Sequence, residues 1–381
     1  MRTLSEAKPS LPGHWYFDPD HYQRELEAIW YRDWICVGRS EVLEKNGDYF
    51  VANIGTQSII VTRSDDELRA FHNTCRHRGS VLCAESSGHF RNGRIICPYH
   101  TWTFSLDGNL VATPYRFETD DFDAADYPLY RVHVEDWRGF VFINLSPGQA
   151  KPFYDSLSDD VALLDNWPLE DMHSVHEEVF QVACNWKIFW ENYSECYHCP
   201  RVHPELCKVM PDYAKGAFDA ADLPGWTPAY DGDVGNGTVG NGARTWSMDG
   251  QIHLPVIEGP TERELEAGIA FAQFPASLYM SGHPDYVRVV RIRPTGPESI
   301  ELVANWLVPK SHSITDPAQL APIVDFVKIV LQQDAEVCEL NQRGLHSNQY
   351  EVGVLTAQEY ELWSFHEAIR QKLRVAEAKI K

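Results

Sequence analysis

The chain has 381 residues, of which 44% are hydrophobic and 23% are charged, and its formal net charge is -22 at pH 7. Such a chain is long enough for two domains, each with its own hydrophobic core. The negative charge argues against nucleic acid or an anionic membrane surface as a partner, and no apolar run reaches the length of a membrane span.

The compartment is predicted from the N-terminus and the cysteines. The first residues, MRTLSEAKPSLPGHW, contain neither the basic start nor the apolar core of a signal peptide. We therefore expect a cytoplasmic protein. Its nine cysteines should then be mostly reduced, which favours metal ligation over a framework of disulfides.

The first predicted element is a helix between Asp18 and Val37, because apolar side chains recur there at helical spacing. From about residue 46 to residue 146 the pattern changes to short β-rich runs such as DYFVANI, SIIVT and ELRAFH. Asn92-Gly93 and Asp107-Gly108 are typical of tight hairpin turns. This region is therefore predicted to form a small all-β domain.

One Cys-x-His pair and one Cys-x-x-His pair lie in this β-rich region. CRHRG contains Cys75 and His77, and CPYHTW contains Cys97 and His100. Two thiolates and two imidazoles on paired loops could bind zinc. They could equally bind a 2Fe-2S cluster in which two histidines replace two cysteines on one iron. Such a cluster relays electrons and does no substrate chemistry, so an enzyme would need a second centre.

The region after residue 150 has a mixed pattern. Helical spacing is found at 153–165 and 186–198, Gly- and Pro-rich loops fill 212–250, and strand-like runs follow at 285–292 and 299–307. Two helices are expected at the end of the chain. The whole region is therefore predicted to be a mixed α/β domain.

The stretch ENYSECYHCPRVHPE brings two histidines into one helix and turn. The helix is expected to stop near Pro200, so that His203 folds back toward His198. An ordinary polar contact between the two histidines is the alternative. Cys196 and Cys199 in the same stretch leave open a redox dithiol or half of a zinc site.

A third ligand is predicted in PIVDFVKIVLQQDAEVCELNQRG. Asp334 falls in the apolar stripe of this helix, seven residues after Val327 and four after Val330. A buried carboxylate costs several kcal/mol unless it is paired or binds a metal. An arginine or a helix N-terminus is the alternative partner. The set His198, His203 and Asp334 is typical of a 2-His-1-carboxylate site for non-haem Fe(II).

These motifs resemble a known family. CRHRG followed by CPYH-x-W resembles the Rieske motif in its oxygenase form. E-N-Y-x-E-x-Y-H-x-x-x-x-H and Q-D-x-x-x-C-E-x-x-Q-R-G-L resemble the catalytic domain of Rieske non-haem iron oxygenase α subunits, in the aromatic-ring-hydroxylating dioxygenase superfamily.

The resemblance implies an α+β fold with two metal centres. A helical leader at 1–40 would pack on the catalytic domain, followed by an all-β Rieske domain at 41–150. A mixed α/β catalytic domain at 151–381, an antiparallel sheet flanked by helices, would hold mononuclear Fe(II). Within the Rieske 2Fe-2S cluster, Cys75 and Cys97 would bind the inner iron, and His77 and His100 the outer iron. Thr101 departs from the family, which more often has a small residue such as glycine there.

The resemblance also implies a route for electrons. Glu195 would bridge two subunits by contacting a Rieske histidine of one protomer and an iron-binding histidine of the next, within a ring-shaped homotrimer. Asn192 matches an asparagine near the iron. The sequence has no dinucleotide-binding fingerprint such as G-x-G-x-x-G, so an external NAD(P)H-dependent ferredoxin reductase or a ferredoxin is expected as partner.

The substrate class is indicated by FWENYSECYHCPRVHPEL, which is similar to the glycine betaine, choline and stachydrine-type oxygenases. This similarity implies hydroxylation of a C–H bond in a quaternary ammonium, with N-demethylation and release of formaldehyde. Arg288, Arg291 and His253 are candidates for binding a carboxylate. Aromatic candidates for the pocket, which suit a quaternary ammonium through cation-π contact, are Trp226, Tyr230, Trp246, Phe271, Phe274, Tyr279, Tyr286 and Trp306.

Three alternatives stay open at this stage. The same centres could carry out aromatic-ring dihydroxylation or O-demethylation. The chain could instead be a Rieske electron-transfer protein without oxygenase activity, or a structural zinc protein. The sequence does not decide whether one or two oxygen atoms are inserted, or whether a β subunit is present.

Overall fold

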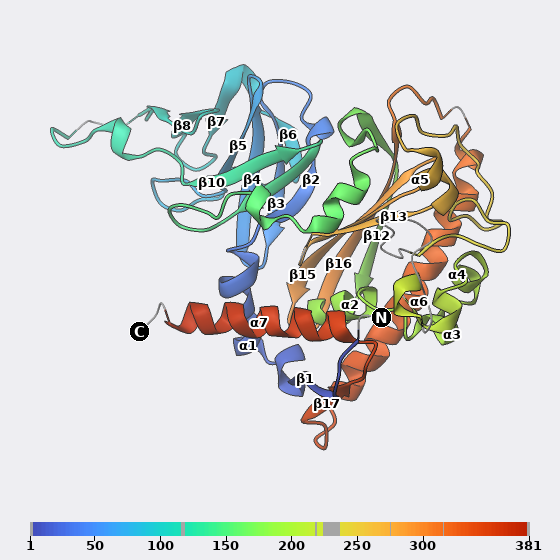
Figure 1. Ribbon diagram of the computed structural model, residues 1–381. Coiled ribbons are helices and arrows are strands. Elements are labelled where there is room, and N and C mark those ends of the chain that lie inside the picture. Colours follow the sequence, from blue (N-terminus) through green and yellow to red (C-terminus); the bar gives the residue numbers. More distant parts are fainter. Residues whose placement is uncertain are drawn as a thin grey trace. The chain divides into compact units, whose positions relative to one another are not determined.

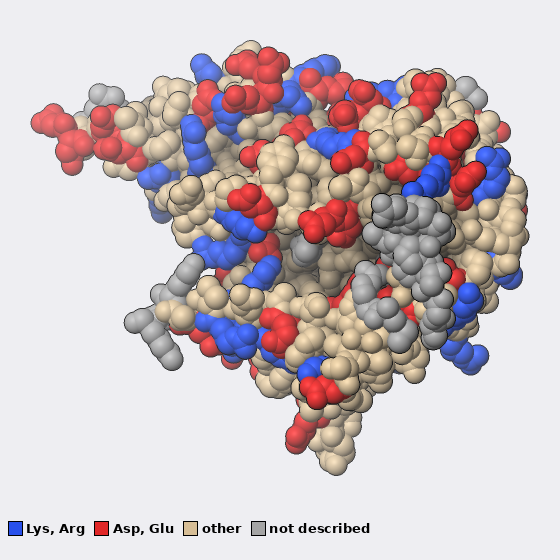
Figure 2. Space-filling view, viewed as in Figure 1, with Lys and Arg blue, Asp and Glu red and all other residues tan. Residues whose placement is uncertain are grey.

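The structure is a computed structural model that describes residues 3–115, 119–217, 219–223, 237–274, 276–314 and 316–378. The chain divides into two compact units, one formed by Trp30–Ser156 and one by Met1–Ile29 together with Leu157–Lys381. None of the described helices is long and apolar enough to cross a membrane. Acidic and basic side chains are interspersed over the described residues on the face shown in Figure 2.

The unit Trp30–Ser156 is built from two antiparallel sheets. The larger has seven strands in the order β2-β11-β10-β5-β4-β3-β6, and the smaller has the order β7-β8-β9. The strands are β2 (Ile35–Arg39), β3 (Asp48–Ile54), β4 (Gln57–Ser64), β5 (Glu67–His72), β6 (Ser87–His89), β7 (Arg94–Ile96), β8 (Thr103–Ser105), β9 (Leu110–Ala112), β10 (Arg131–Trp137) and β11 (Phe140–Asn144).

A hydrophobic core lies between these two sheets. It joins Ile60 and Phe71 of the large sheet to Ile95 and Phe104 of the small one, and all four side chains are fully buried. Full burial of side chains of this size contributes about 1.5–3 kcal/mol each. The core therefore fixes the β7–β8 hairpin, at whose tip CPYHTW lies, against the end of β5, after which CRHRG follows.

The second unit contains a five-stranded antiparallel sheet in the order β12-β16-β15-β14-β13. Its strands are β12 (Met172–Val182), β13 (Ala270–Phe274), β14 (Leu278–Gly282), β15 (Val287–Gly296) and β16 (Ser299–Pro309). A small separate pair, β1 (Lys8–Pro12) and β17 (Val352–Leu355), joins the two ends of this unit. Figure 1 shows the sheet with its accompanying helices.

The helices of this unit are α1 (Pro19–Glu25), α2 (Trp186–Tyr193), α3 (Cys199–Val202), α4 (Pro204–Val209), α5 (Glu262–Ala267), α6 (Ala321–Leu345) and α7 (Tyr360–Ala378). The helices α2 and α6 pack on each other and on the same face of the sheet. Tyr279 of β14 stacks on Trp190 of α2, and Glu178 of β12 pairs with Lys328 of α6. The register places Glu178 and Tyr279 in one row across the sheet, so their side chains share a face.

The leader belongs to this second unit up to Ile29. Glu25 of α1 is fully buried, where it pairs with Lys187 at 2.6 Å and accepts a hydrogen bond from Trp186 Nε1 at 2.8 Å. A buried ion pair of this kind needs all its partners, since an unpaired charge would be strongly destabilising. The pair therefore fixes α1 to the start of α2.

The predicted fold class, an all-β unit and a mixed α/β unit with an antiparallel sheet, is confirmed. Three helical predictions were wrong in extent. The leader helix ends in a π-helical turn at Leu26–Trp30 and gives way to β2, because the apolar residues after Trp30 pair as a strand. The region 153–165 forms only short 3-10 turns, and the predicted helix 186–198 ends at Tyr193.

Candidate metal centres

The two Cys-His loops of the all-β unit have the same backbone geometry. In the first, the amide of Cys75 donates to Ser80 O at 2.8 Å and that of Gly79 donates to Cys75 O at 3.0 Å. In the second, Cys97 donates to Trp102 O at 2.8 Å and Thr101 donates to Cys97 O at 3.0 Å. Each loop thus closes around its own cysteine by an equivalent pair of hydrogen bonds.

One residue in each loop has a left-handed backbone. Gly79 has φ +73° and Thr101 has φ +58°. Glycine adopts this conformation without steric cost, whereas a β-branched residue is strained there. The predicted departure at Thr101 therefore falls on the position where the loop geometry favours glycine.

The side chains of these loops are arranged as a cluster would require. Cys75 and Cys97 are 2% and 1% exposed, and their thiols are in contact. Burial raises the pKa of Cys75 to about 11, so an unliganded thiol there stays protonated. The rings of His77 and His100 lie 4.7 Å apart, nearer the surface, and His77 stacks on Trp102. Four donors of the predicted types therefore converge, with the cysteines inside and the histidines outside.

The second centre gathers His198, His203 and Asp334. The Nε2 atoms of the two histidines lie 3.2 Å apart. Asp334 Oδ1 lies 2.9 Å from Nε2 of His203 and 3.4 Å from Nε2 of His198. Two ligands at right angles and each about 2.1 Å from a metal are about 3.0 Å apart. The three atoms therefore have the spacing of three ligands on one face of a metal ion.

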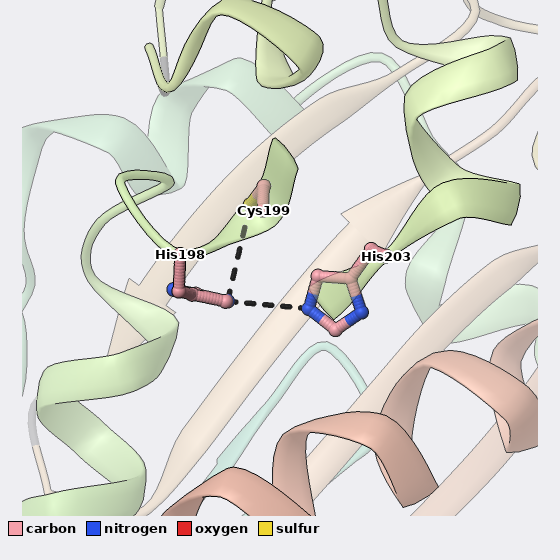
Figure 3. A group of neighbouring side chains, drawn as sticks. All are labelled: His198, Cys199 and His203. Carbon is pink, nitrogen blue, oxygen red and sulfur yellow. Dashed lines mark hydrogen bonds between the residues drawn. The ribbon is translucent and has the colours of Figure 1, made fainter. Parts of the chain in front are cut away.

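Local chain geometry explains how the histidines meet. His198 precedes α3 and His203 lies between α3 and α4, each of which has proline in its first turn. Proline is tolerated there because no intrahelical amide donor is required. The prediction that the preceding helix stops near Pro200 was wrong, since α2 ends at Tyr193 and Pro200 lies in the first turn of α3. Figure 3 shows His198 and His203 facing each other across this turn.

Asp334 comes from the middle of α6, as the apolar stripe predicted. It is buried, and no arginine is among its contacts in the described residues; its partners are the two histidines. Of the predicted partners for this buried carboxylate, an arginine, a helix N-terminus or a metal, this geometry favours the metal.

Two further predicted residues contact His198. Glu195 Oε1 lies 2.7 Å from its Nδ1, and Asn192 Nδ2 lies 3.3 Å from its Nε2. Glu195 also accepts hydrogen bonds from the backbone amides of Tyr197 and His198. These bonds hold the turn after α2 in place of a further helical turn. The side chain of Glu195 thereby fixes the orientation of the His198 ring.

A residue that the sequence did not indicate orients the other histidine. Gln333 Oε1 lies 2.9 Å from Nδ1 of His203, and Gln333 Nε2 donates to Glu205 Oε2 at 2.9 Å. Because the amide oxygen accepts, Nδ1 carries the proton and Nε2 is free to bind a metal. The position of Gln333 next to Asp334 on α6 is the only sequence signal for its role in orienting His203.

Negative charge accumulates at this centre. Burial alone would lower the pKa of His198, but hydrogen bonds with Asp334 and Glu195 outweigh burial and raise it to about 9. Burial opposes, yet does not prevent, a lowered pKa for Asp334, because both histidines bond to the carboxylate. Two carboxylates around two imidazoles therefore provide a site that a cation would neutralise.

Cys196 and Cys199, in the same stretch as the two histidines, are poorer candidate metal ligands than Asp334. Cys196 and Cys199 form a disulfide, with Cα atoms 4.9 Å apart. The seven other cysteines are free, so this pair is the exception to the expected reduced state. His198, Cys199 and His203 offer donor atoms within 4.8 Å of one another, but Cys199 Sγ lies 3.9 Å from His198 Nε2. Asp334 Oδ1 is nearer to His198 Nε2 than this sulfur is, and the carboxylate carries a negative charge.

A pocket opens beside the second centre. Its lining includes the three candidate ligands, with Arg288 of β15 and four aromatic residues: Tyr193, Tyr213, Trp246 and Phe271. Trp246 and Phe271 were predicted, whereas Tyr193 and Tyr213 were not. Tyr279, Tyr286 and Trp306 are fully buried and Phe274 nearly so. The predicted residues Trp226 and Tyr230 lie outside the described residues.

Comparison with known families identifies both units. Residues 33–123 match the Rieske [2Fe-2S] domain, and residues 169–375 match the ring hydroxylating alpha subunit (catalytic domain). The second match covers more than half of the chain. The chain belongs to this family of oxygenase α subunits. It is a Rieske non-haem iron oxygenase, as the motifs predicted, and the two domains imply a Rieske 2Fe-2S cluster and mononuclear iron as cofactors.

Individual relatives narrow the branch. The chain is 30% identical to the glycine betaine monooxygenase oxygenase subunit of Chromohalobacter salexigens, over 93% of this chain and 83% of that protein. It is 27% identical to the chloroplastic choline monooxygenase of Beta vulgaris, over 90% and 72%. A crystal structure of the quaternary ammonium Rieske monooxygenase CntA has the same fold, with a TM-score of 0.74 at 23% identity, covering 96% of this chain and 95% of that one.

Proposed function

We propose that this oxygenase hydroxylates an N-methyl group of a quaternary ammonium substrate, so that the product loses formaldehyde. The observation that carries the proposal is the pocket that four aromatic side chains line together with His198, His203 and Asp334. Aromatic faces attract a quaternary ammonium through cation-π interaction, which contributes about 2 kcal/mol when the cation is desolvated. The named activities of the relatives support the same substrate class.

In this proposal His198, His203 and Asp334 hold the mononuclear iron, and Cys75, Cys97, His77 and His100 hold the Rieske cluster. When bound, the iron supplies oxygen chemistry at a C–H bond and the cluster supplies electrons. The protein's own contribution is orientation. Glu195 and Gln333 each bond to the Nδ1 atom of one histidine, which leaves both Nε2 atoms directed at the same point.

The aromatic walls exclude water and position the substrate. Tyr193 of the pocket wall belongs to an aromatic cluster, with its ring 4.1 Å from that of Tyr279 and 5.9 Å from that of Phe271. Burial raises the pKa of Tyr193 to about 12, so its hydroxyl stays neutral and adds no second charge to the pocket. A neutral aromatic wall suits N-methyl groups better than a hydrogen-bonding wall would.

Electrons must come from a partner, and we propose an external NAD(P)H-dependent ferredoxin reductase or a ferredoxin. We also propose a homotrimer in which Glu195 connects an iron-binding histidine to a Rieske histidine of the neighbouring protomer. The contact of Glu195 with His198 supports the first half of this bridge. The Glu195 side chain is 15% exposed, which leaves it accessible for the proposed contact with a Rieske histidine of the neighbouring protomer.

The experiment is turnover of the iron-loaded oxygenase with a surrogate reductase and NADH. Glycine betaine, choline and small aromatic compounds are compared by formaldehyde release and by analysis of hydroxylated products. We expect formaldehyde in a one-to-one ratio with the demethylated amine. Formation of ring diols, or of O-demethylated products only, would replace this proposal with the corresponding alternative activity.

A further inference from the structure

Arg288 is the residue of the pocket that the proposed chemistry does not yet use. It lies in the central strand β15 and is 1% exposed. The register aligns it with Ser281 of β14 and Trp306 of β16, in the row that also contains Phe271. This row faces α2, so the guanidinium reaches the pocket beside the iron ligands.

The guanidinium has few partners in this position. Nη2 donates to the hydroxyl of Tyr193, while Nε and Nη1 are buried without a hydrogen-bond acceptor among the described residues. The remaining neighbours are aromatic faces, with the ring centroids of Trp246 and Tyr193 at 5.0 and 5.5 Å. No carboxylate within the described part of the chain forms an ion pair with Arg288.

A buried guanidinium with unsatisfied donors is stabilised when an anion binds to it. Arginine remains charged at any physiological pH, so Arg288 cannot relieve its burial by losing a proton. Leaving a buried charged donor unsatisfied carries a large desolvation penalty. Trp246 adds a second donor at the same pocket, since its Nε1 is also buried without an acceptor in the described residues.

We infer that Arg288 binds a carboxylate of the substrate, and that the substrate is therefore a zwitterionic betaine and not a simple cationic amine. The inference rests on the proposed function, because the same molecule must present its N-methyl group to the iron. A planar guanidinium pairs with a carboxylate through two parallel hydrogen bonds, from Nε and Nη2 or from Nη1 and Nη2. Each Nη atom carries two hydrogens, so the bond from Nη2 to Tyr193 leaves one of these edges open. A cation such as choline would leave this edge unpaired and would face a like charge.

The other predicted cations are placed differently. Arg291 is three residues after Arg288 on β15, so its side chain points to the opposite face of the sheet, where its Nη2 lies 3.9 Å from Oε2 of Glu177. His253 already pairs with Asp249 at 2.8 Å at the surface. Neither lines the pocket, so the structure selects Arg288 among the three.

The test measures binding to the holoenzyme by titration calorimetry. Two matched pairs of probes are used: glycine betaine against choline, and carnitine against its methyl ester. The variants are Arg288→Gln, Arg288→Lys and, as control on the opposite face of the strand, Arg291→Gln. The Rieske absorbance spectrum and circular dichroism of each variant verify that it folds and is loaded.

We expect the wild type to bind at least one carboxylate probe about 10- to 100-fold more tightly than the counterpart that lacks the carboxylate, the usual effect of a charge-assisted hydrogen bond. Arg288→Gln should abolish that preference, Arg288→Lys should retain part of it because the charge remains but the bidentate edge does not, and Arg291→Gln should retain all of it. Equal binding within both wild-type pairs, or an unchanged preference in folded Arg288→Gln, would overturn the inference; the wild-type comparison holds even if a variant misfolds.

Formaldehyde release separates the two proposals. Tight carboxylate binding that depends on Arg288, but without formaldehyde from any probe, would refute N-demethylation and leave the carboxylate site standing. Formaldehyde from choline as readily as from glycine betaine would support N-demethylation and refute the role of Arg288.

Discussion

Asp334 Oδ1 lies 2.9 Å from His203 Nε2, although 131 residues separate the two in sequence. The contact joins the middle of the long helix α6 to the short turn between α3 and α4. Because α6 is packed along the sheet by its apolar stripe, the carboxylate is held by a rigid element while the histidines come from a turn. The centre is thus assembled by the packing of α6, and residues that fix its orientation should affect iron binding.

Replacement of Gln333 by leucine tests this orientation directly. Leucine removes the acceptor of the His203 Nδ1 proton while keeping a similar volume, so the ring and its tautomer are no longer fixed. Loss of such a partner typically costs about 10- to 100-fold in metal affinity. Iron affinity, measured by competition with a chelator, should fall by this amount in Gln333→Leu.

The control is the adjacent Gln332→Leu, since Gln332 is exposed on α6 and bonds only weakly to Glu336 at 3.5 Å. It should bind iron as the wild type does. Equal affinities for the two variants would show that Gln333 has no orienting role.

Glu195→Gln should leave both metal centres loaded and slow electron transfer between them. The amide keeps the size of the side chain but loses the charge that accompanies the hydrogen bond to His198. We expect a decrease of about 10- to 100-fold in the single-turnover rate at which the reduced cluster is reoxidised, in line with the loss of other residues that support metal ligands.

Glu195→Asp provides the conservative comparison for that rate. Aspartate restores the charge with a shorter reach and should recover part of the transfer rate. An unchanged rate in Glu195→Gln, with iron and cluster fully loaded, would remove the proposed bridge.

Thr101→Gly should stabilise the all-β unit. A non-glycine residue in the left-handed region costs about 1–2 kcal/mol, and the greater freedom of glycine in the unfolded chain offsets about 0.4–1 kcal/mol of this gain. The free energy of unfolding in urea, followed by loss of the cluster absorbance, should therefore increase by up to about 1.6 kcal/mol.

Thr103→Gly is the matched control for that substitution. Thr103 is the first residue of β8, where glycine weakens the strand, so this variant should be less stable than the wild type. A lower stability of Thr101→Gly would mean that the hydrogen bond from its hydroxyl to His100 O outweighs the backbone strain.

Cys199→Ala should keep the mononuclear iron. The sulfur of Cys199 is bonded to Cys196 and lies farther from His198 Nε2 than Asp334 does. Iron content by emission spectrometry should therefore equal that of the wild type. Loss of the iron from Cys199→Ala, with the Rieske cluster still in place, would make the cysteine a ligand.

Features that depend on a local sequence pattern, such as a short motif or an apolar stripe along a helix, were predictable from the sequence. The paired Cys-His motifs located two loops whose side chains converge, and the apolar stripe of α6 predicted that Asp334 would be buried. The end of α2 was not predictable, because Glu195 bonds to the amides of Tyr197 and His198 in place of a helical turn, and no composition signal marks that choice.

The roles of Gln333 and Arg288 depend on tertiary packing. Arg288 lies in a strand buried on both faces, where alternation of apolar and polar residues does not distinguish the pocket side. Gln333 bonds to a histidine 130 residues away. Only the assembled structure places these side chains beside the candidate iron ligands.

Metal content and turnover of Asp334→Ala provide the most direct test of the assigned iron centre, with the exposed Asp325→Ala of the same helix as control. The wild type and Asp325→Ala should contain about three iron atoms per protomer, two in the cluster and one mononuclear, and should release formaldehyde from an N-methyl betaine. Asp334→Ala should keep the Rieske spectrum, fall to about two iron atoms per protomer and release no formaldehyde. Full iron content with sustained turnover in Asp334→Ala would contradict the assignment of His198, His203 and Asp334 as the iron site.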